Sequence, residues 1–321
     1  MISQNNIADI YEGLLIRLLN NPDYVTSPRG MQINELINFS YEISNPNYFI
    51  INSQTRKTNE KYLAGELIWY LSGNNDLEHI SKFSKFWNKL TDDGKLNSSY
   101  GHIIWKQKNK NGITPWMWAY QALVNDRDTR QAVIHFNSID HASIGEKDFP
   151  CTMYAQFFIR NNSLNLIVNM RSQDIWFGYT YDIPFFSLML IEMKNQLRDF
   201  ANIDVNLGTL KMNIGSLHMY GKDISDASDI FKKPLYIDTD KGKYVYVDTN
   251  ESLMLDARLF DRVGNELVPS TELQYVIDKW YKKEVKQDKE KNKDTNIKMP
   301  KIEIKSNFIN WIDSVTKKGD N

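Results

Sequence analysis

Residues 148–174 read DFPCTMYAQFFIRNNSLNLIVNMRSQD, and this stretch decides the fold. Its apolar runs predict two strands, Tyr154–Ile159 and Leu164–Met170, and the polar residues between them are typical of a hairpin turn. Cys151, the one cysteine of the chain, stands just after a proline and just before the first strand. We therefore expect a β-hairpin preceded by a candidate nucleophile, with the groups that assist it following soon after in the chain.

The regions on either side of the hairpin predict helices and further strands. Apolar residues recur at helical spacing over Ile7–Leu19 and Thr58–Leu71. Phe185–Leu197 predicts another helix, with Pro184 in its first turn. Other patterned segments are expected as strands at 31–40, 132–136 and 212–220, and as helices at 273–291 and after a capping serine at 306.

The domain organisation follows from what the chain lacks. We find no internal repeat and no linker rich in Gly, Ser or Pro. We expect residues 1–250 to form one catalytic domain and residues 251–321 to form a C-terminal helical extension of unknown role. Mixed charges from Lys282 to Lys293 predict a solvated helix face or a flexible linker within that extension.

Composition limits the classes of protein to consider. Lys and Arg number 39 against 40 Asp and Glu, so the net charge of -1 gives no electrostatic case for nucleic acid or an anionic membrane as partner. One cysteine cannot form an internal disulfide, which fits a reducing compartment. We see no secretory leader and no apolar run long enough for a membrane span. We therefore expect a soluble, cytoplasmic protein.

The side chains available for chemistry favour covalent catalysis. The five histidines lack the spacing of metal ligands, and the single cysteine has no second cysteine with which to bind a metal. No phosphate-binding GxxxxGK[ST] loop is present. We therefore expect no metal. What remains is a cysteine with arginines, hydroxyls, carboxylates and amides, which suits covalent catalysis on an anionic substrate. A lone cysteine is also commonly a buried, inert residue, and composition alone leaves both interpretations open.

Other single residues carry similar alternatives. Glu66 lies within an apolar helix, where a carboxylate is either paired or functional, or else is turned outward to solvent. Arg29, in the turn 26–30, is either solvated or an anion contact. His218 and Tyr220 are two apart, so they share one face of a strand, as ligand contacts or as exposed surface.

The order of several motifs points to a family. Pro150-Cys151, Gln156, Arg171-Ser172-x-Asp174, Gly178 and His218-x-Tyr220 follow one another, and Gly65–Gly73, Tyr100-Gly101 and Thr129-Arg130 precede them. This pattern, spanning about residues 58–220, resembles the thymidylate synthase family of folate-dependent pyrimidine-nucleotide enzymes. The resemblance implies an α/β (α+β) fold with a mixed sheet and flanking helices. It also implies a symmetric homodimer.

The resemblance assigns roles at the reacting base and at the co-substrate. Cys151 corresponds to the nucleophile that adds to carbon 6 of the pyrimidine. Glu66 corresponds to a residue that organises water and relays protons, and Tyr100 to one near the proton leaving carbon 5. The co-substrate implied is 5,10-methylenetetrahydrofolate, with Asp174 and Trp87 on the folate side.

The resemblance also assigns the nucleotide contacts. Arg171 and Ser172 correspond to phosphate ligands, and Arg130 reaches into the site of the partner subunit. The family usually has a second arginine after this one, but here it is Gln131, so the phosphate is expected either to be bound more weakly or to rely more on Arg29. Three further residues are expected to contact the nucleotide: Gln156, His218 and Tyr220, the last two at the sugar hydroxyls.

The residue that selects the base is expected at position 182, eleven residues after Arg171. Thymidylate synthases have asparagine there, matching uracil, whereas Asp182 matches cytosine, as in the dCMP hydroxymethylases of the family. A carboxylate facing the uracil oxygen should cost about 1 to 3 kcal/mol. The alternative is that Asp182 points elsewhere.

We therefore expect one-carbon transfer to carbon 5 of a cytosine nucleotide, most simply (deoxy)cytidylate 5-hydroxymethylation through a covalent cysteine adduct. The alternative enzyme is a thymidylate synthase that methylates dUMP. A third interpretation is a catalytically silent, dimeric binding protein, which the intact set of Cys151, Glu66, Tyr100 and Arg171 disfavours. The sequence leaves open whether the sugar is ribose or deoxyribose.

Overall fold

The computed structural model describes residues 2–4, 7–47, 50–51, 58–142, 145–232, 259–264, 266–288 and 305–317. The chain divides into two compact units, each described by itself below. The first unit comprises 1–59, 118–140 and 149–251, and the second comprises 60–117, 141–148 and 252–321. The predicted boundary near residue 250 lies outside the described residues.

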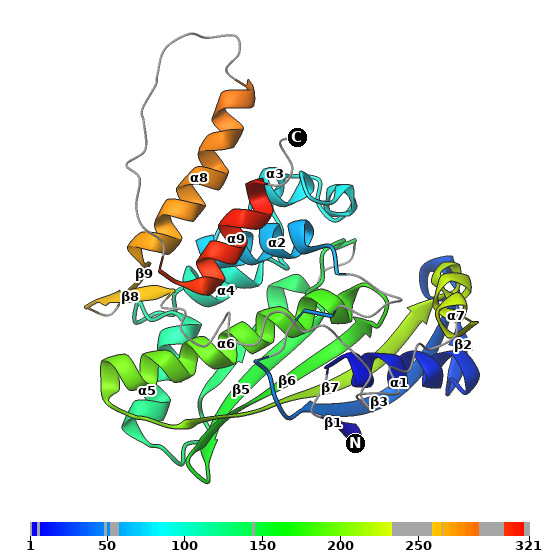
Figure 1. Cartoon of the computed structure of the whole chain (residues 1–321), viewed down its shortest axis with the longest axis horizontal. Helices are drawn as coiled ribbons and strands as arrows, with labels where there is room; N and C mark the ends of the chain where they lie inside the picture. Colours follow the sequence, from blue (N-terminus) through cyan, green and yellow to red (C-terminus); the bar gives the residue numbers. More distant parts are fainter. Residues whose placement is uncertain are drawn as a thin grey trace, which may run out of the picture. The chain divides into compact units, whose positions relative to one another are not determined.

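The first unit is built on a seven-stranded mixed sheet within the described residues, in the order β1-β3-β7-β6-β5-β4, with β2 paired to β3 (Figure 1). Most neighbours are antiparallel, but β6 and β7, like β1 and β3, run parallel. The strands are β1 (Ile2–Gln4), β2 (Tyr24–Thr26), β3 (Ile33–Ile43), β4 (Val133–His135), β5 (Thr152–Arg160), β6 (Ser163–Asp174) and β7 (Asn206–Tyr220). The predicted hairpin is confirmed as β5 and β6.

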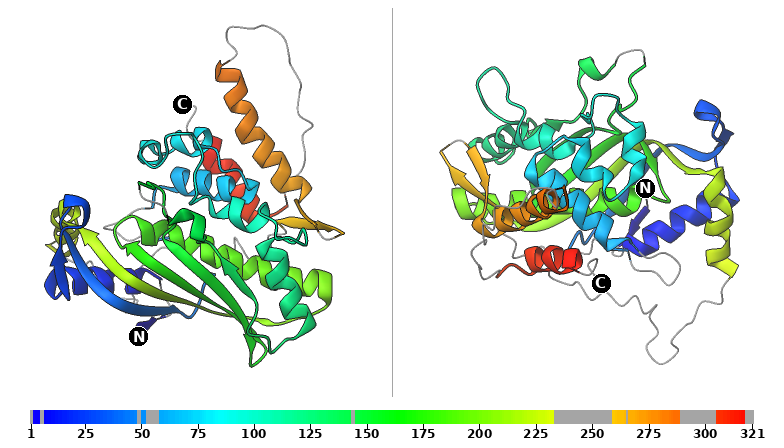
Figure 2. Two further views of the ribbon diagram at one scale, coloured as in Figure 1. Left: turned by 180° about the vertical axis from the view of Figure 1, so that it is seen from behind. Right: turned by 90° about the horizontal axis from the view of Figure 1, so that it is seen from above.

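Helices cover one face of this sheet. The helices of the unit are α1 (Ile7–Asn20), α6 (Gly178–Ala201), α7 (Ile224–Lys232) and most of α5 (Pro115–Asn125). The rings of Tyr11, Tyr41 and Tyr179 join α1, β3 and α6, with centroids 5.5 and 5.6 Å apart. Seen from behind, the strands lie in front of α6 (Figure 2). The described helices of this unit leave this face of the sheet uncovered (Figure 2).

Strands β3, β7 and β6 share a kink, which lies at neighbouring positions of the three strands. The core-facing residues of β6 are the even positions up to Met170 and then the odd positions from Gln173. The same change of parity occurs on β3 near Asn38, which has a φ of 54°, and on β7 at Gly215. A Cβ at Gly215 would lie 2.8 Å from the Arg171 carbonyl oxygen, so this close crossing requires glycine. The kink leaves Arg171 exposed while its neighbours on β6 stay partly or fully covered.

The predicted start of the long helix after Pro184 is wrong. Helix α6 begins at Gly178, and Pro184 lies inside it. Proline at this position withholds one N–H from the Thr180 carbonyl and crowds that carbonyl, but the added turn buries Tyr179 and Ile183 completely. Asp182 therefore stands on a helix, one turn from its N-terminus.

The second unit is mainly helical. Its elements are α2 (Glu60–Ser72), α3 (Leu77–Ser81), η2 (Lys85–Lys89), α4 (Tyr100–Trp105), α8 (Thr271–Asp288), α9 (Asn307–Lys317) and a small sheet of β8 (Phe260–Val263) with β9 (Glu266–Pro269). Ser306 caps α9 as predicted, because its Oγ accepts from the Ile309 N–H at 3.3 Å. Helix α9 packs against α2 and α8.

Candidate active site

Arg171 is fastened to the segment that carries Cys151. Its backbone N–H donates to the Cys151 carbonyl at 2.8 Å. Its guanidinium donates to the carbonyls of Phe149 at 2.6 Å and Pro150 at 3.2 Å, and lies over the Phe149 ring. The nucleophile candidate is half-buried at the start of β5, and an exposed arginine stands beside it. The backbone thus holds the guanidinium of Arg171 on the two residues that precede the nucleophile candidate.

Four more predicted residues gather around this pair. Asp174 pairs with His218 across the parallel strands β6 and β7, and Ser172 pairs with Ser216. The rings of His218 and Tyr220 meet edge to face, 5.1 Å apart, so the prediction that they share a face is confirmed. These residues follow the kink, on the sheet positions opposite to those that face the core.

Arg29 belongs to the same group. Its side chain donates a hydrogen bond to Tyr220, and its charge acts on both Tyr220 and His218. Its backbone is in the left-handed region, with φ 53° and ψ 30°, which is unusual for a residue with a side chain. Arg29 is therefore held toward the site, rather than merely solvated in a loop.

The pKa shifts of His218 and Tyr220 fit a site that binds neutral, hydrogen-bonding groups of a ligand. Burial lowers the pKa of His218 below its usual value, so the imidazole is neutral at physiological pH. Burial raises the pKa of Tyr220, and the charges of Asp174 and Cys151 add to this rise. A neutral imidazole and a neutral phenol can each donate and accept, as sugar hydroxyls require.

Asp182 and Asp174 form a pair of carboxyl groups with raised pKa values. Burial raises the pKa of Asp182 to about 7, against the hydrogen bond from Gln173, and Asp174 adds to the rise. Burial raises the pKa of Asp174 to about 6, although the Trp176 N–H donates to it at 2.9 Å. Gly178 lies between the two side chains, and a Cβ there would approach Asp182 Oδ2 to 3.3 Å. Asp182 thus faces the end of β6, where Gln173 Nε2 donates to its Oδ2 at 3.0 Å.

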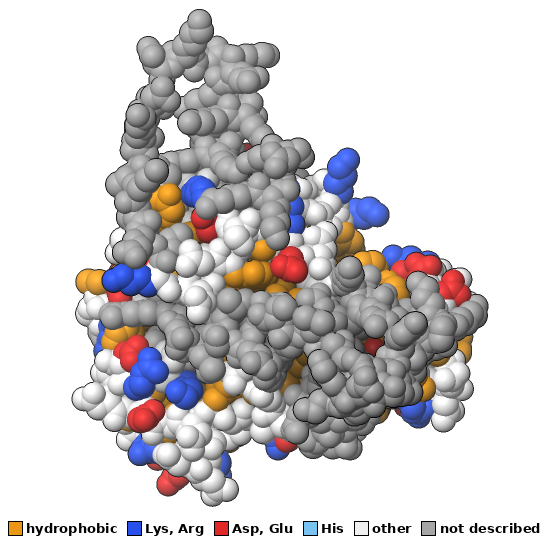
Figure 3. Space-filling model, viewed as in Figure 1, with side chains coloured by type: hydrophobic (Ala, Val, Ile, Leu, Met, Phe, Trp, Pro, Cys, Tyr) orange, Lys and Arg blue, Asp and Glu red, His pale blue; other side chains and the backbone are white. Residues whose placement is uncertain are grey.

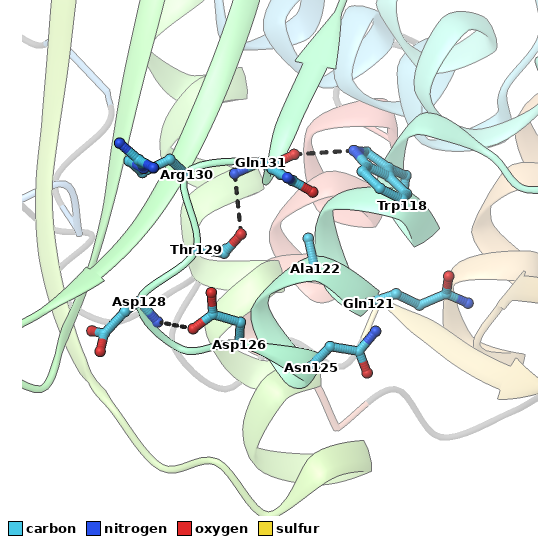
Figure 4. Close-up of a pocket in the computed structure, with 9 residues that line it drawn as sticks. All are labelled: Trp118, Gln121, Ala122, Asn125, Asp126, Asp128, Thr129, Arg130 and Gln131. Atoms are coloured by element: carbon cyan, nitrogen blue, oxygen red, sulfur yellow. Dashed lines mark hydrogen bonds between the residues drawn. The ribbon is translucent and has the colours of Figure 1, made fainter.

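Arg130 and Gln156 lie in another part of the first unit. Gln156 Nε2 donates to the Arg130 carbonyl at 2.7 Å, and no hydrogen bond or ion pair among the described residues joins either of them to Arg171. Arg130 borders a cavity of about 650 Å³ between the loop 126–131 and α5. Figure 4 shows its guanidinium extending away from Trp118 and α5. Gln131 lines this cavity too, and its carbonyl accepts from Trp118 Nε1 at 3.0 Å.

The remaining predicted residues lie in the second unit. Glu66 is only 6% exposed, so the interpretation as a solvated surface residue is wrong. Tyr62 donates to Glu66 Oε1 at 2.8 Å, and Trp87 Nε1 donates to the Tyr62 hydroxyl at 3.0 Å. A buried carboxylate requires such partners.

Tyr100 is positioned by close packing of α4 on α2. Its ring stacks on Tyr70 with centroids 5.4 Å apart. A Cβ at Gly101 would lie 1.7 Å from the Tyr70 carbonyl oxygen, so only glycine permits this approach. Trp69 links Tyr70 to Trp87 through ring contacts of 5.2 and 5.3 Å. Glu66, Trp87 and Tyr100 therefore belong to one packed cluster of this unit.

Three residues of these clusters were not predicted from the sequence. Gln173 occupies the unspecified position of the Arg171-Ser172-x-Asp174 motif, yet it contacts Asp182. Tyr62 lies within the helix expected over Thr58–Leu71, and its spacing of four from Glu66 is a usable signal. Glu35 accepts from Ser216 Oγ and acts on His218, and nothing in the sequence pattern indicates this.

Neither the surface charge nor the metal-ligating residue types point to a further site within the described residues. Lys, Arg, Asp and Glu side chains are interspersed over the described part of the face in Figure 3. Among the described residues no cluster of His, Cys, Asp and Glu is arranged to hold a metal ion. No described helix has the length and apolar character needed to cross a membrane.

Comparison with known proteins identifies the class. The sequence model described as thymidylate synthase matches residues 10–317. The chain therefore belongs to the thymidylate synthase family, and the predicted fold class is confirmed by this match together with the mixed sheet. It is a transferase of the kind that moves methyl or hydroxymethyl groups.

Curated relatives of this chain carry different names. Deoxycytidylate 5-hydroxymethyltransferase of Enterobacteria phage T4 is 28% identical over 211 residues, covering 64% of this chain and 82% of that protein. Deoxyuridylate hydroxymethyltransferase of Bacillus phage SP01 is 28% identical over 227 residues, covering 67% and 57%. Thymidylate synthase of Francisella tularensis subsp. holarctica is 27% identical over 200 residues, covering 58% and 70%. The choice of substrate must therefore be argued from the site.

Proposed function

We propose that this protein transfers a one-carbon unit to carbon 5 of a cytosine nucleoside monophosphate, and that water completes a 5-hydroxymethyl group. The observation that carries this proposal is the Asp182 carboxyl group, part-buried at the end of β6 with a pKa of about 7. The relative from phage T4, named for deoxycytidylate hydroxymethylation, is in keeping with it.

A carboxyl group that is protonated near neutral pH complements cytosine. Its O–H donates to ring nitrogen N3, and its carbonyl oxygen accepts from the exocyclic amino group. Uracil presents a donor at N3 and an acceptor at position 4. The carboxylate therefore loses the contact to that oxygen, and the neutral acid satisfies uracil only when its proton lies on the other oxygen. Such a mismatch costs about 1 to 3 kcal/mol, which corresponds to about tenfold or more in selectivity.

Cys151 supplies the covalent step in this proposal. Its sulfur forms a bond to carbon 6, and the electrons of the carbon 5–carbon 6 double bond make carbon 5 nucleophilic. Carbon 5 then bonds to the one-carbon unit, and the carbon 5 proton leaves. The bond from that unit to the folate nitrogen breaks and releases tetrahydrofolate, water adds to the resulting methylene group, and the double bond re-forms as the thiolate departs. The Arg171 guanidinium, held by the carbonyls of Phe149 and Pro150, offers a cation to the nucleotide phosphate. Ser172, His218, Tyr220 and Arg29 are the further nucleotide contacts we propose.

Glu66 and Tyr100 are the proposed proton-handling residues of the second unit. A buried Glu66 that accepts from Tyr62 is oriented by its partner and can order water. The phenol of Tyr100 is held in place by stacking on Tyr70. It could position a water molecule or a base near the proton that leaves carbon 5. Both roles come from the family resemblance.

The folate co-substrate is supported by the residues present on each unit. When bound, 5,10-methylenetetrahydrofolate supplies the one-carbon unit. Asp174 is a part-buried carboxyl group that can accept from the ring N–H groups of a pterin. Trp87 donates its indole N–H to Tyr62, and the folate contact proposed for it would be made through its ring.

A homodimer in which Arg130 serves the partner subunit belongs to the same proposal. Arg130 is exposed and has no bond to Arg171 among the described residues, so it is available to another chain. With Gln131 in place of a second arginine, each phosphate would meet Arg171, Arg29 and one arginine from the partner.

Thymidylate synthesis from dUMP is the second candidate, favoured by the relative from Francisella tularensis. One assay separates the two. Release of tritium from carbon 5 of dCMP, CMP and dUMP is measured with methylenetetrahydrofolate, while absorbance reports dihydrofolate. We expect release with a cytosine nucleotide and no dihydrofolate. Release with dUMP alone would refute the cytosine proposal, dihydrofolate would refute simple hydroxymethylation, and no release with any substrate would favour a binding protein.

The variant Asp182→Asn tests the residue directly. An amide in that place matches uracil, so we expect the preference to move toward dUMP by about tenfold or more. Asp199→Asn, on the same helix and paired with Arg198, is the matched control. A preference that Asp182→Asn leaves unchanged would contradict the assigned role.

A further inference from the structure

A buried hydrogen-bond relay leads from Tyr41 through Gln173 to Asp182. The Tyr41 hydroxyl donates to Gln173 Oε1 at 2.7 Å, and Gln173 Nε2 donates to Asp182 Oδ2 at 3.0 Å. The three side chains come from β3, β6 and α6 of the first unit. Tyr41 is wholly buried and Gln173 is 2% exposed, so water does not compete for these bonds.

Tyr41 decides which end of the Gln173 amide faces Asp182. A buried phenol must place its proton on an acceptor, and Gln173 Oε1 is the acceptor it meets. The amide nitrogen is thereby turned toward Asp182 Oδ2 and toward the Met170 sulfur, 3.6 Å away. Both amide hydrogens have a partner, so the orientation is held from both ends.

This orientation gives the two oxygens of Asp182 different roles. Oδ2 receives the amide hydrogen, so a proton on the carboxyl group belongs on Oδ1. Protonated Asp182 then offers an O–H donor at Oδ1 and a second lone pair at Oδ2. The missing side chain at Gly178 leaves space next to Oδ2, where a Cβ would lie at 3.3 Å.

We propose that Gln173 is a specificity-determining positioning residue. Held by Tyr41, it makes Oδ2 of Asp182 the acceptor for the cytosine amino group and Oδ1 the donor to N3. The inference rests on the proposed function, because it concerns how Asp182 reads the base.

The reversed amide would undo this selection. Gln173 Oε1 facing Asp182 requires the proton on Oδ2, and Oδ1 then presents only lone pairs. Cytosine N3 would meet an acceptor, whereas the N3–H of uracil would be satisfied. Loss of the Tyr41 hydroxyl frees the amide to reverse, so Tyr41 influences the choice of base without touching it.

Nucleotide binding without folate tests this role in the full-length protein. Calorimetry measures the affinities for dCMP and dUMP, which share sugar and phosphate, so their ratio isolates the base. We expect Tyr41→Phe to lower the dCMP-to-dUMP affinity ratio by about tenfold, the value of one hydrogen bond to this group. Gln173→Leu lowers it at least as much. It also moves the loss of dCMP binding to higher pH, because the bond it removes favours the carboxylate.

Tyr179→Phe is the matched control. Tyr179 is equally buried, its ring lies 5.6 Å from that of Tyr41, and its hydroxyl donates to the Ile7 carbonyl at 2.9 Å, away from Gln173. It should leave the ratio unchanged. A wild-type protein that prefers dUMP would refute the proposed function and this inference together. A wild-type preference for dCMP that Tyr41→Phe and Tyr179→Phe alter equally would refute the role of Gln173 alone. Should Gln173→Leu fail to fold, Tyr41→Phe still decides.

Discussion

The Tyr62 hydroxyl donates to Glu66 Oε1 at 2.8 Å, one helical turn apart on α2. The same hydroxyl accepts from Trp87 Nε1 at 3.0 Å, so it stands between a tryptophan and a buried carboxylate. Trp87 is the residue we place on the folate side, and Glu66 is the one we assign to water and protons. Tyr62 therefore connects the two proposed roles within the second unit.

Removing this hydroxyl should slow the reaction without preventing nucleotide binding. In Tyr62→Phe, Glu66 loses an oriented donor and Trp87 loses its acceptor. We expect kcat to fall about tenfold, the value of a hydrogen bond to a charged group, while the dCMP dissociation constant changes little. Steady-state kinetics and calorimetry provide the two measurements.

Tyr281→Phe is the control for this prediction. The Tyr281 hydroxyl meets Ser72 Oγ on the same helix at 3.1 Å, so the variant removes a comparable bond elsewhere on α2. Equal losses of kcat in the two variants would indicate a general effect on the helix.

Arg29→Gly should separate binding from stability. Arg29 has a left-handed backbone, which glycine adopts freely, so the free energy of unfolding should stay the same or rise by up to about 1 kcal/mol. The lost guanidinium should raise the KM for the nucleotide by about tenfold or more. Thermal unfolding and kinetics test the two parts. A variant that is less stable and has an unchanged KM would show that Arg29 is structural.

The β5–β6 hairpin could be predicted from the sequence because its pattern is local. The two runs are continuous in their apolar character and are separated by a polar turn at 160–163, where Asn161 and Asn162 have positive φ values. Cys151 and Arg171 flank this hairpin, so their proximity follows from the chain itself.

Gln173 and Tyr62 could not be assigned in the same way. Gln173 faces the core only because the kink at Arg171 changes the parity of β6, and parity changes arise from strand packing. Tyr62 fits an apolar helix face, and its function depends on Trp87, which lies 25 residues away. The start of α6 was mispredicted because tertiary burial of Tyr179 outweighs the local signal of Pro184.

Subunit mixing tests whether Arg130 acts across a dimer. At nucleotide concentrations well below the KM of the variants, Arg130→Ala should be strongly impaired alone because it lacks one phosphate contact, and Cys151→Ala should be inactive alone because it lacks the nucleophile. In a mixed dimer, one site combines intact Cys151 with the intact Arg130 of the other chain. Random mixing should restore about a quarter of wild-type activity. Tritium release after joint refolding measures this, and no recovery in a mixture shown to contain mixed dimers would contradict the shared site.

The pH dependence of base selection follows from Asp182. Its pKa of about 7 lies above the ordinary value of 3.8, so the protonated form that complements cytosine is lost as pH rises through about 7. The dCMP-to-dUMP affinity ratio should fall by about tenfold per pH unit above that value. The charged group that acts on Asp182 is Asp174, which has a pKa of about 6 and so titrates at a lower pH than Asp182. Tyr41, with a pKa raised well above 10.0, stays neutral throughout this range. Calorimetry across this range tests the slope, and a flat ratio would contradict it.

The same carboxyl group should make the folded protein less stable at higher pH. Because the folded-state pKa of Asp182 is raised, the folded state holds a proton that the unfolded state has released between about pH 4 and pH 7. The unfolded state therefore binds fewer protons in this window, and the free energy of unfolding falls as pH increases through it. Asp182→Asn removes this titration while its side-chain oxygen can still accept from Gln173. Its Tm should exceed that of the wild type at about pH 8 by more than at about pH 5. Thermal unfolding at the two pH values tests this, and a difference in Tm that does not vary with pH would show that Asp182 titrates alike in both states.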